Sequence, residues 1–192
     1  MLPAARWGRL RVQGLECVPA EGALLIVPNH DSQWDAPVIG FVLLRKRRLR
    51  FLARADLWRN PLARVVLDAL GQIPIERGAG DAAALERAAA ALRRGEAVGV
   101  FPEGRLSGGE RLRARSGVGR LAAAEPGVAV VLCAVEGTSD YVRFPTRPRV
   151  TVSFFAPAGG DPRRGEEPLE LAGRLLAEVR ERVEPVPRGW RP

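Results

Sequence analysis

The stretch IVPNHDSQWDAPVIG, residues 26–40, contains the signals of a buried strand, a polar turn and a helix in direct succession. The apolar run ALLIVPN at residues 23–29 predicts a strand that is buried on both faces, because polar residues do not alternate within it. Asp35 is a plausible N-cap of the following helix, and Pro37 lies in its first turn, where a missing N–H does no harm. His30, the only histidine of the chain, lies in the turn between strand and helix.

Strand and helix patterns alternate along the rest of the chain. Further strands are predicted at residues 49–53, 72–77, 97–104, 128–137 and 149–157. Helices are predicted at residues 35–48, 55–71 with an interruption near Pro61, 80–95, 117–127 and 166–185. This order predicts an α/β fold, a single three-layer domain with a mostly parallel or mixed central sheet flanked by helices. We expect one domain over residues 1–192, with a core at about 12–157, a C-terminal helix at about 166–184 and a short tail at 185–192.

Composition and charge narrow the classes of partner. The net charge of +8 favours an anionic partner, which is a nucleic acid, an acidic membrane surface or a phosphorylated substrate. Cys17 and Cys133 match no metal or redox spacing, so we expect no metal and a reducing cytoplasm. The first residues show no secretory signal, and the best apolar stretch, residues 36–44, is shorter than the roughly 20 residues that span a bilayer. Any contact with a membrane is therefore expected to be peripheral.

The pair of His30 and Asp35 is a candidate for general-base chemistry. An imidazole accepts a proton near pH 7, and a carboxylate on one ring nitrogen fixes its tautomer and leaves the other nitrogen as the base. On these two residues alone, a turn histidine beside an N-cap aspartate is an equally good interpretation. None of the serines lies in the G-x-S-x-G pattern, so the group to be activated is expected to be a substrate hydroxyl, without a covalent enzyme intermediate.

Two further segments carry candidate site residues. VFPEGRLSGG at residues 100–109 ends a predicted strand with Glu103 and Gly104, where open α/β sheets bind ligands; the alternative is a loop with a chance acid. PIERG at residues 74–78 places Arg77 at another strand end, where its planar fork suits a phosphate; the alternative is a solvated surface arginine. The adjacent GAGDAA fits a degenerate dinucleotide pattern, but its aspartate opposes a pyrophosphate at the helix start, which disfavours that function.

Three segments together resemble the glycerolipid acyltransferase family, which includes the 1-acylglycerol-3-phosphate acyltransferases. They are NHDSQWD at residues 29–35, IPIERG at residues 73–78 and FPEGRLSGG at residues 101–109, in the order and approximate spacing of that family. The resemblance covers about residues 12–152. It implies transfer of a fatty acyl group from acyl-CoA or acyl carrier protein to the hydroxyl of a lysophospholipid. The acceptor that it favours is 1-acylglycerol 3-phosphate, and no cofactor is expected.

The resemblance also implies roles for individual residues. His30 would be the general base and Asp35 its orienting partner, while Arg77 would bind the phosphate of the acceptor. Glu103 and Gly104 would complete the acceptor and oxyanion region. The further substrate-binding candidates are Asn29, Arg105, Ser107, Arg115 and Gly117.

Departures from the family pattern leave the acceptor open. Arg105, Leu106 and Ser107 replace the usual Thr-Arg-Ser, and VVLCAVEG lacks the proline common in that strand. Glycerol 3-phosphate, lysophosphatidylethanolamine, a glycolipid and an ornithine lipid are the alternative acceptors. A non-catalytic basic module is the alternative of a different class; no zinc finger or RNA-binding signature supports it, so we expect no nucleic-acid partner.

An anionic membrane surface is the remaining expected partner. Residues 37–52 and 57–67 combine apolar side chains with arginines, and Trp34 and Trp58 suit a lipid interface. The alternative is that these segments are core-facing helices with solvated basic ends. We expect a cytoplasmic protein that associates peripherally with the inner face of the membrane.

Overall fold

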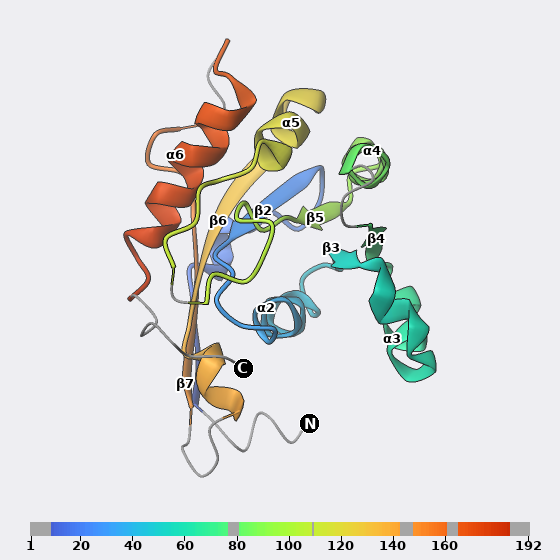
Figure 1. The fold of residues 1–192 in the computed structure, drawn as a ribbon. Helices are drawn as coiled ribbons and strands as arrows, with labels where there is room; N and C mark the ends of the chain where they lie inside the picture. The colour runs from blue at the N-terminus through green and yellow to red at the C-terminus, as the bar shows by residue number, and fades with distance from the viewer. Residues whose placement is uncertain (1–8, 77–80, 109, 143–147, 161–164, 185–192) are drawn as a thin grey trace.

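The fold is an α/β structure built on one seven-stranded sheet (Figure 1). The computed structural model describes residues 9–76, 81–108, 110–142, 148–160 and 165–184. The strands are β1 (Arg9–Gln13), β2 (Leu24–Pro28), β3 (Leu49–Arg54), β4 (Ile73–Ile75), β5 (Ala97–Gly99), β6 (Ala129–Glu136) and β7 (Arg149–Phe155). The α-helices are α2 (Asp35–Leu43), α3 (Pro61–Leu70), α4 (Asp81–Arg93), α5 (Gly117–Ala124) and α6 (Pro168–Arg180). Short 3-10 helices are η1 (Leu15–Cys17), η2 (Ala55–Arg59) and η3 (Thr138–Val142).

The sheet is mixed, as the sequence predicts. Its strand order is β1-β7-β6-β2-β5-β3-β4, and every neighbouring pair is parallel except β6 and β7. The predicted strands are all present. Strand β1 was not predicted; it is an edge strand of five exposed residues that pairs only with β7, so burial imposes no pattern on its sequence.

The connections place helices on both faces of the sheet. The connections through α2 and α3 step along the sheet in one direction, and those through α4 and α5 step back. Right-handed crossovers therefore place α2 and α3 on one face and α4 and α5 on the other. Figure 1 agrees, with α4, α5 and α6 in the upper part of the view and α2 and α3 in the lower part. Two core clusters follow: one joins α4, α5 and α6 to the sheet, and the other joins α2.

The start of α2 differs from the predicted capping. Trp34 occupies the N-cap position without a side-chain hydrogen bond, and Asp35 is the first helical residue. The reason is that the Asp35 carboxylate accepts the backbone N–H groups of Asp31 and Ser32, which lie before the helix. The carboxylate therefore holds the turn that contains His30 against the helix start.

The end of α2 also differs from the prediction. The helix ends at Leu43, so the basic run that follows lies outside it. Lys46 donates a hydrogen bond to the carbonyl of Leu15, and Arg47 donates to the carbonyls of Pro19 and Gly22. These two cations tie the loops before β2 to the end of α2. The interruption predicted near Pro61 is confirmed, since Asn60 caps α3 directly after η2.

Within the described residues, no helix has both the length and the apolar character needed to cross a membrane.

Candidate active site

The loops that follow β2 and β5 meet at one edge of the sheet and bring His30 and Glu103 together. Because β2 and β5 are parallel neighbours, their carboxyl ends lie at the same edge. The backbone N–H of His30 donates to Glu103 Oε1 at 3.2 Å, and the N–H of Ser107 donates to the carbonyl oxygen of His30 at 2.8 Å. Two of the predicted motifs, 73 residues apart, thus form one site.

The imidazole of His30 is held on one edge and one face. Its Nδ1 lies 3.2 Å from Asp35 Oδ2, in hydrogen-bonding contact. The ring stacks on Phe101 with centroids 3.8 Å apart, and Phe101 in turn stacks on Phe51. The His30 side chain is 20% exposed, and no described residue hydrogen-bonds to its Nε2. The ring therefore has one nitrogen committed to Asp35 and the other available to a bound molecule.

The Asp35 carboxylate is fully buried and is oriented by donors from two segments, the turn before α2 and the residue after β6. Oδ2 accepts the N–H groups of Asp31 at 2.7 Å and Ser32 at 2.8 Å, in addition to its contact with His30. Oδ1 accepts the hydroxyl of Thr138, which follows β6. With this many fixed partners, Asp35 has little freedom to move away from the imidazole. Thr138 was not predicted, because nothing in its local sequence marks it.

A buried ion cluster lies directly behind His30. Arg180, at the end of α6, donates through Nη1 to both carboxylate oxygens of Asp31, at 2.9 and 2.7 Å. Its Nη2 donates to Glu103 Oε1 at 2.6 Å. The guanidinium therefore clamps the loop after β2 to the loop after β5. Neither Asp31 nor Arg180 was predicted as a site residue; Asp31 lies within the quoted motif, whereas Arg180 is one of several arginines late in an amphipathic helix.

The cluster perturbs the protonation of its members. Burial raises the pKa of Glu103, and the positive charge of Arg180 offsets only part of this effect. Burial lowers the pKa of Arg180, but Asp31 and Glu103 outweigh it and the net shift is upward, so the guanidinium stays charged. Glu103 Oε2 is buried and has no hydrogen-bond partner among the described residues. Burial of the Glu103 carboxylate in this cluster is therefore only partly compensated by its contact with Arg180.

Two predicted substrate-binding side chains make hydrogen bonds within the protein. Asn29 is fully buried: its Nδ2 donates to Asp31 and to the carbonyl of Val135, and its Oδ1 accepts the N–H of Val135. Ser107 is also buried, and its hydroxyl donates to Asp31. A contact with substrate was predicted for both, but their polar groups cross-link β2, β6 and the two loops.

The remaining predicted residues are Gly104, Arg105, Arg115, Gly117 and Arg77, and the structure describes the first four of them. Gly104 has a φ of 67° and carries the Arg115 side chain over it, so that a Cβ at Gly104 would lie 2.6 Å from Arg115 Cδ. The Gly104 N–H donates to the carbonyl of Phe101 within the turn. Arg105 is exposed and pairs with Glu110 at 2.9 Å. The last two candidates are Gly117, which begins α5, and Arg77, which lies outside the described residues.

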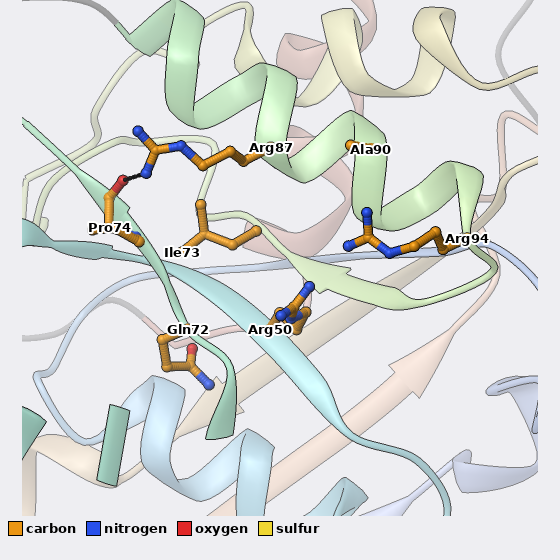
Figure 2. Close-up of a pocket in the computed structure, with 7 residues that line it drawn as sticks. All are labelled: Arg50, Gln72, Ile73, Pro74, Arg87, Ala90 and Arg94. Atoms are coloured by element: carbon orange, nitrogen blue, oxygen red, sulfur yellow. Dashed lines mark hydrogen bonds between the residues drawn. The ribbon is translucent and has the colours of Figure 1, made fainter. Parts of the chain in front are cut away.

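Two hollows lie near β3 and β4. One, of about 640 Å³, lies at the carboxyl ends of both strands and is lined by Arg54, Ala55, Asp56, Arg59, Ile75 and Glu76. It opens at the same edge of the sheet as the His30 turn. The other, of about 270 Å³, lies between α4 and the two strands and has Arg50, Arg87 and Arg94 in its wall (Figure 2). No predicted site residue lines this second hollow, and Glu96 already pairs with two of its three arginines.

Removing the Arg180 clamp is expected to destabilise the fold. Arg180→Ala leaves the buried carboxylates of Asp31 and Glu103 without their cation, which costs about 3 kcal/mol in free energy of unfolding. Arg180→Lys keeps the charge but not the fork, so we expect a smaller loss. Urea denaturation measures both, with the exposed Arg120→Ala as control. A loss no larger than that of the control would contradict the role of the clamp.

Glu103 is expected to make stability depend on pH. Because its pKa in the folded state is raised above the ordinary value of 4.5, the folded state binds this proton more tightly than the unfolded state. Its contribution to stability is therefore complete below the ordinary pKa and is lost as pH rises through the raised one. Urea denaturation at a series of pH values gives the free energy of unfolding of the wild type and of Glu103→Gln. The wild-type value minus the Glu103→Gln value should fall as pH rises from 4.5 through the raised pKa of Glu103. If the free energies of unfolding of the two proteins changed with pH in parallel, the raised pKa of Glu103 would be disproved.

Comparisons with known proteins show the family of this chain. The profile of the Acyltransferase family matches residues 9–136, more than half of the chain. The chain is 34% identical over 170 residues to a lyso-ornithine lipid O-acyltransferase from Pseudomonas aeruginosa, covering 85% of this chain and 59% of that protein. It is 33% identical over 105 residues to a 1-acyl-sn-glycerol-3-phosphate acyltransferase from Borreliella burgdorferi, covering 53% of this chain and 41% of that protein.

A solved structure supports the same fold. The 1-acyl-sn-glycerophosphate acyltransferase PlsC from Thermotoga maritima superposes with a TM-score of 0.71 at 23% identity, covering 93% of this chain and 74% of that one. The chain spans between two fifths and three fifths of the length of the two curated relatives. The extent of the family match and the joined motifs lead to one conclusion: this chain belongs to the Acyltransferase family.

Proposed function

We propose that this chain transfers a fatty acyl group from a thioester donor to the hydroxyl of a lysolipid, with His30 as the general base. The observation that carries the proposal is the contact of His30 Nδ1 with the buried Asp35 carboxylate at 3.2 Å, which leaves Nε2 available. The relatives support the reaction class, since both are named as acyltransferases and both names specify lysolipid acceptors. Acyl-CoA or acyl carrier protein is the donor that we propose.

The geometry suits direct transfer. With Nδ1–H donated to Asp35, Nε2 accepts the proton of the acceptor hydroxyl while the hydroxyl oxygen bonds to the thioester carbonyl carbon. The tetrahedral intermediate collapses by breaking the C–S bond, and the departing thiolate receives the proton from Nε2. Asp35 stabilises the imidazolium between these two steps and holds the ring in place. The stack on Phe101 fixes the plane of the ring, so the base is oriented before the substrate binds.

The hollow at the ends of β3 and β4 is the proposed headgroup site. Arg54 and Arg59 lie in its wall, and Arg77 follows Glu76 directly in the sequence. The wall holds two arginines: Arg54 pairs with Asp56, and Arg59 suits a phosphate. We therefore propose 1-acylglycerol 3-phosphate as the acceptor, taken from the inner face of the membrane. Arg77 is proposed to bind this phosphate.

A second acceptor is favoured by one feature of the same wall. Asp56 and Glu76 face the hollow together with the arginines, so that both signs of charge are present. An ornithine headgroup carries an ammonium as well as a carboxylate and suits a wall of mixed charge. The lyso-ornithine lipid O-acyltransferase relative, which matches 85% of this chain, supports this candidate.

Removing the imidazole is expected to abolish catalysis and leave the fold intact. His30→Ala should lower kcat by about 100- to 10,000-fold, the usual contribution of a positioned general base. The assay follows release of free thiol from acyl-CoA in the presence of 1-acylglycerol 3-phosphate. Gln33→Ala, an exposed residue of the same turn, is the matched control and should retain activity. Undiminished kcat in His30→Ala would refute the base assignment.

The two acceptors are separated by charge variants of the headgroup hollow. For 1-acylglycerol 3-phosphate, Arg59→Ala should raise KM about tenfold by loss of a charge-assisted contact, and Glu76→Gln should not raise it. For lyso-ornithine lipid, Glu76→Gln should raise KM instead, because it removes the partner of the ammonium. The proposed acceptor requires the first pattern and a higher kcat/KM for 1-acylglycerol 3-phosphate in the wild type. If Glu76→Gln raises KM for lyso-ornithine lipid and the wild type has the higher kcat/KM for that lipid, the acceptor is lyso-ornithine lipid instead.

A further inference from the structure

Helix α3 presents its apolar side to the solvent. None of its residues is buried, and only Ala63 and Leu67 are half-buried, on the side that faces the protein. Arg64 and Asp68 form an ion pair on a second side. The third side is an apolar stripe at helical spacing, between 39% and 79% exposed, formed by Leu62, Val65, Val66 and Leu70. This is the reverse of a surface helix in a water-soluble domain, which turns its apolar stripe to the core.

Helix α2 repeats this feature on the same face of the sheet. Its inner side packs into the core through Ile39 and Leu43, while Trp34, Phe41 and Leu44 are each 45% or more exposed on its outer side. With Leu57 of η2, the segment from Trp34 to Leu70 holds eight of the eleven large apolar residues that are exposed in the described part of the chain. We call the outer sides of α2, η2 and α3 the α2–α3 surface. Exposed apolar residues on two helices that cover one face of the sheet are typical of an interaction site.

The charge around this surface identifies the kind of partner. Residues 36–70 contain eight arginines and lysines but only two acidic residues. Arg45 and Arg48, which follow α2, and Arg59, which precedes α3, are exposed. A second copy of the chain docked on this surface would bring like charges together, whereas an anionic lipid leaflet is complementary to them. Apolar side chains with tryptophan and flanking arginines are also the composition of interfacial membrane-binding helices.

We propose that the α2–α3 surface docks on the anionic leaflet of a lipid membrane, with α3 inserted by its apolar stripe. Trp34, at the edge of this surface, is four residues from His30, so docking brings the turn that contains His30 near the leaflet. The inference deepens the proposed function, because a lysolipid acceptor lies in such a leaflet. The docking itself depends only on the exposed apolar side chains and the cations.

Co-sedimentation with vesicles tests the docking without any measurement of activity. The full chain is mixed with vesicles of phosphatidylglycerol and phosphatidylcholine in equal parts. The double variant Leu62→Asp/Val66→Asp should bind at least about tenfold more weakly, because two apolar side chains no longer leave water. Neither position is buried, so the variant should fold, which circular dichroism verifies. Leu169→Asp is the matched control, since Leu169 is equally exposed on α6, across the sheet, and this variant should bind as wild type does.

A second comparison tests the charge. Arg48→Glu should weaken binding, and high salt should release the wild type, whereas Arg120→Glu on α5 should bind as wild type does. Undiminished binding by Leu62→Asp/Val66→Asp, or an equal loss in Leu169→Asp, would overturn the proposal. Dimers of the wild type that the double variant abolishes, without vesicle binding, would assign the surface to a second copy instead. His30→Ala should bind vesicles as wild type does, so a failed catalytic role and a failed docking role are told apart.

Discussion

The carboxylate of Asp35 is the point on which the candidate site depends. It is fully buried, and its two oxygens receive the imidazole of His30, two backbone N–H groups of the preceding turn and the hydroxyl of Thr138. A carboxylate in this position without such partners would be costly to bury. Three partners belong to the turn before α2 and the fourth follows β6, so the same contacts that satisfy the charge also fix the ring. Folding of this turn therefore also orients the imidazole of His30.

The ion cluster behind this carboxylate extends the constraint to the last helix. Arg180 joins Asp31 and Glu103, and Asp31 in turn receives Asn29 and Ser107. Both loops of the site are thereby held to α6, 149 residues after Asp31 in the sequence. The cluster contains two carboxylates for one guanidinium, and one oxygen of Glu103 lacks a described partner. A network of this kind fixes geometry more than it adds stability, which suits a site where the base must be placed before the substrate arrives.

The sequence alone predicts the strands of the interior, and the physical reason is burial. A strand such as β2 is covered on both faces, so its apolar run is unmistakable, whereas β1 is an exposed edge and carries no comparable signal. His30, Asp35 and Glu103 could be selected because the motifs join a polar turn to a strand end. Arg180 and Thr138 could not, since their partners are more than 70 residues away and neither residue has a local signature. Asn29 and Ser107 were assigned to substrate because a polar residue looks the same in sequence whether it meets a ligand or a neighbouring strand.

Helix α3 shows a further limit of sequence patterns. Its apolar stripe has the spacing of a core-facing helix, and the periodicity is identical whether the stripe faces inward or outward. The orientation is decided by topology: α3 connects β3 to β4, and β4 is a three-residue strand at the edge of the sheet. So short an edge offers little area to cover, and α3 makes its main contacts with η2. The stripe is left outside because the sheet ends beneath it, so the sequence retains apolar residues that the core of this chain does not use. Such a pattern persists at a cost in solubility, which is offset where the surface meets an apolar medium.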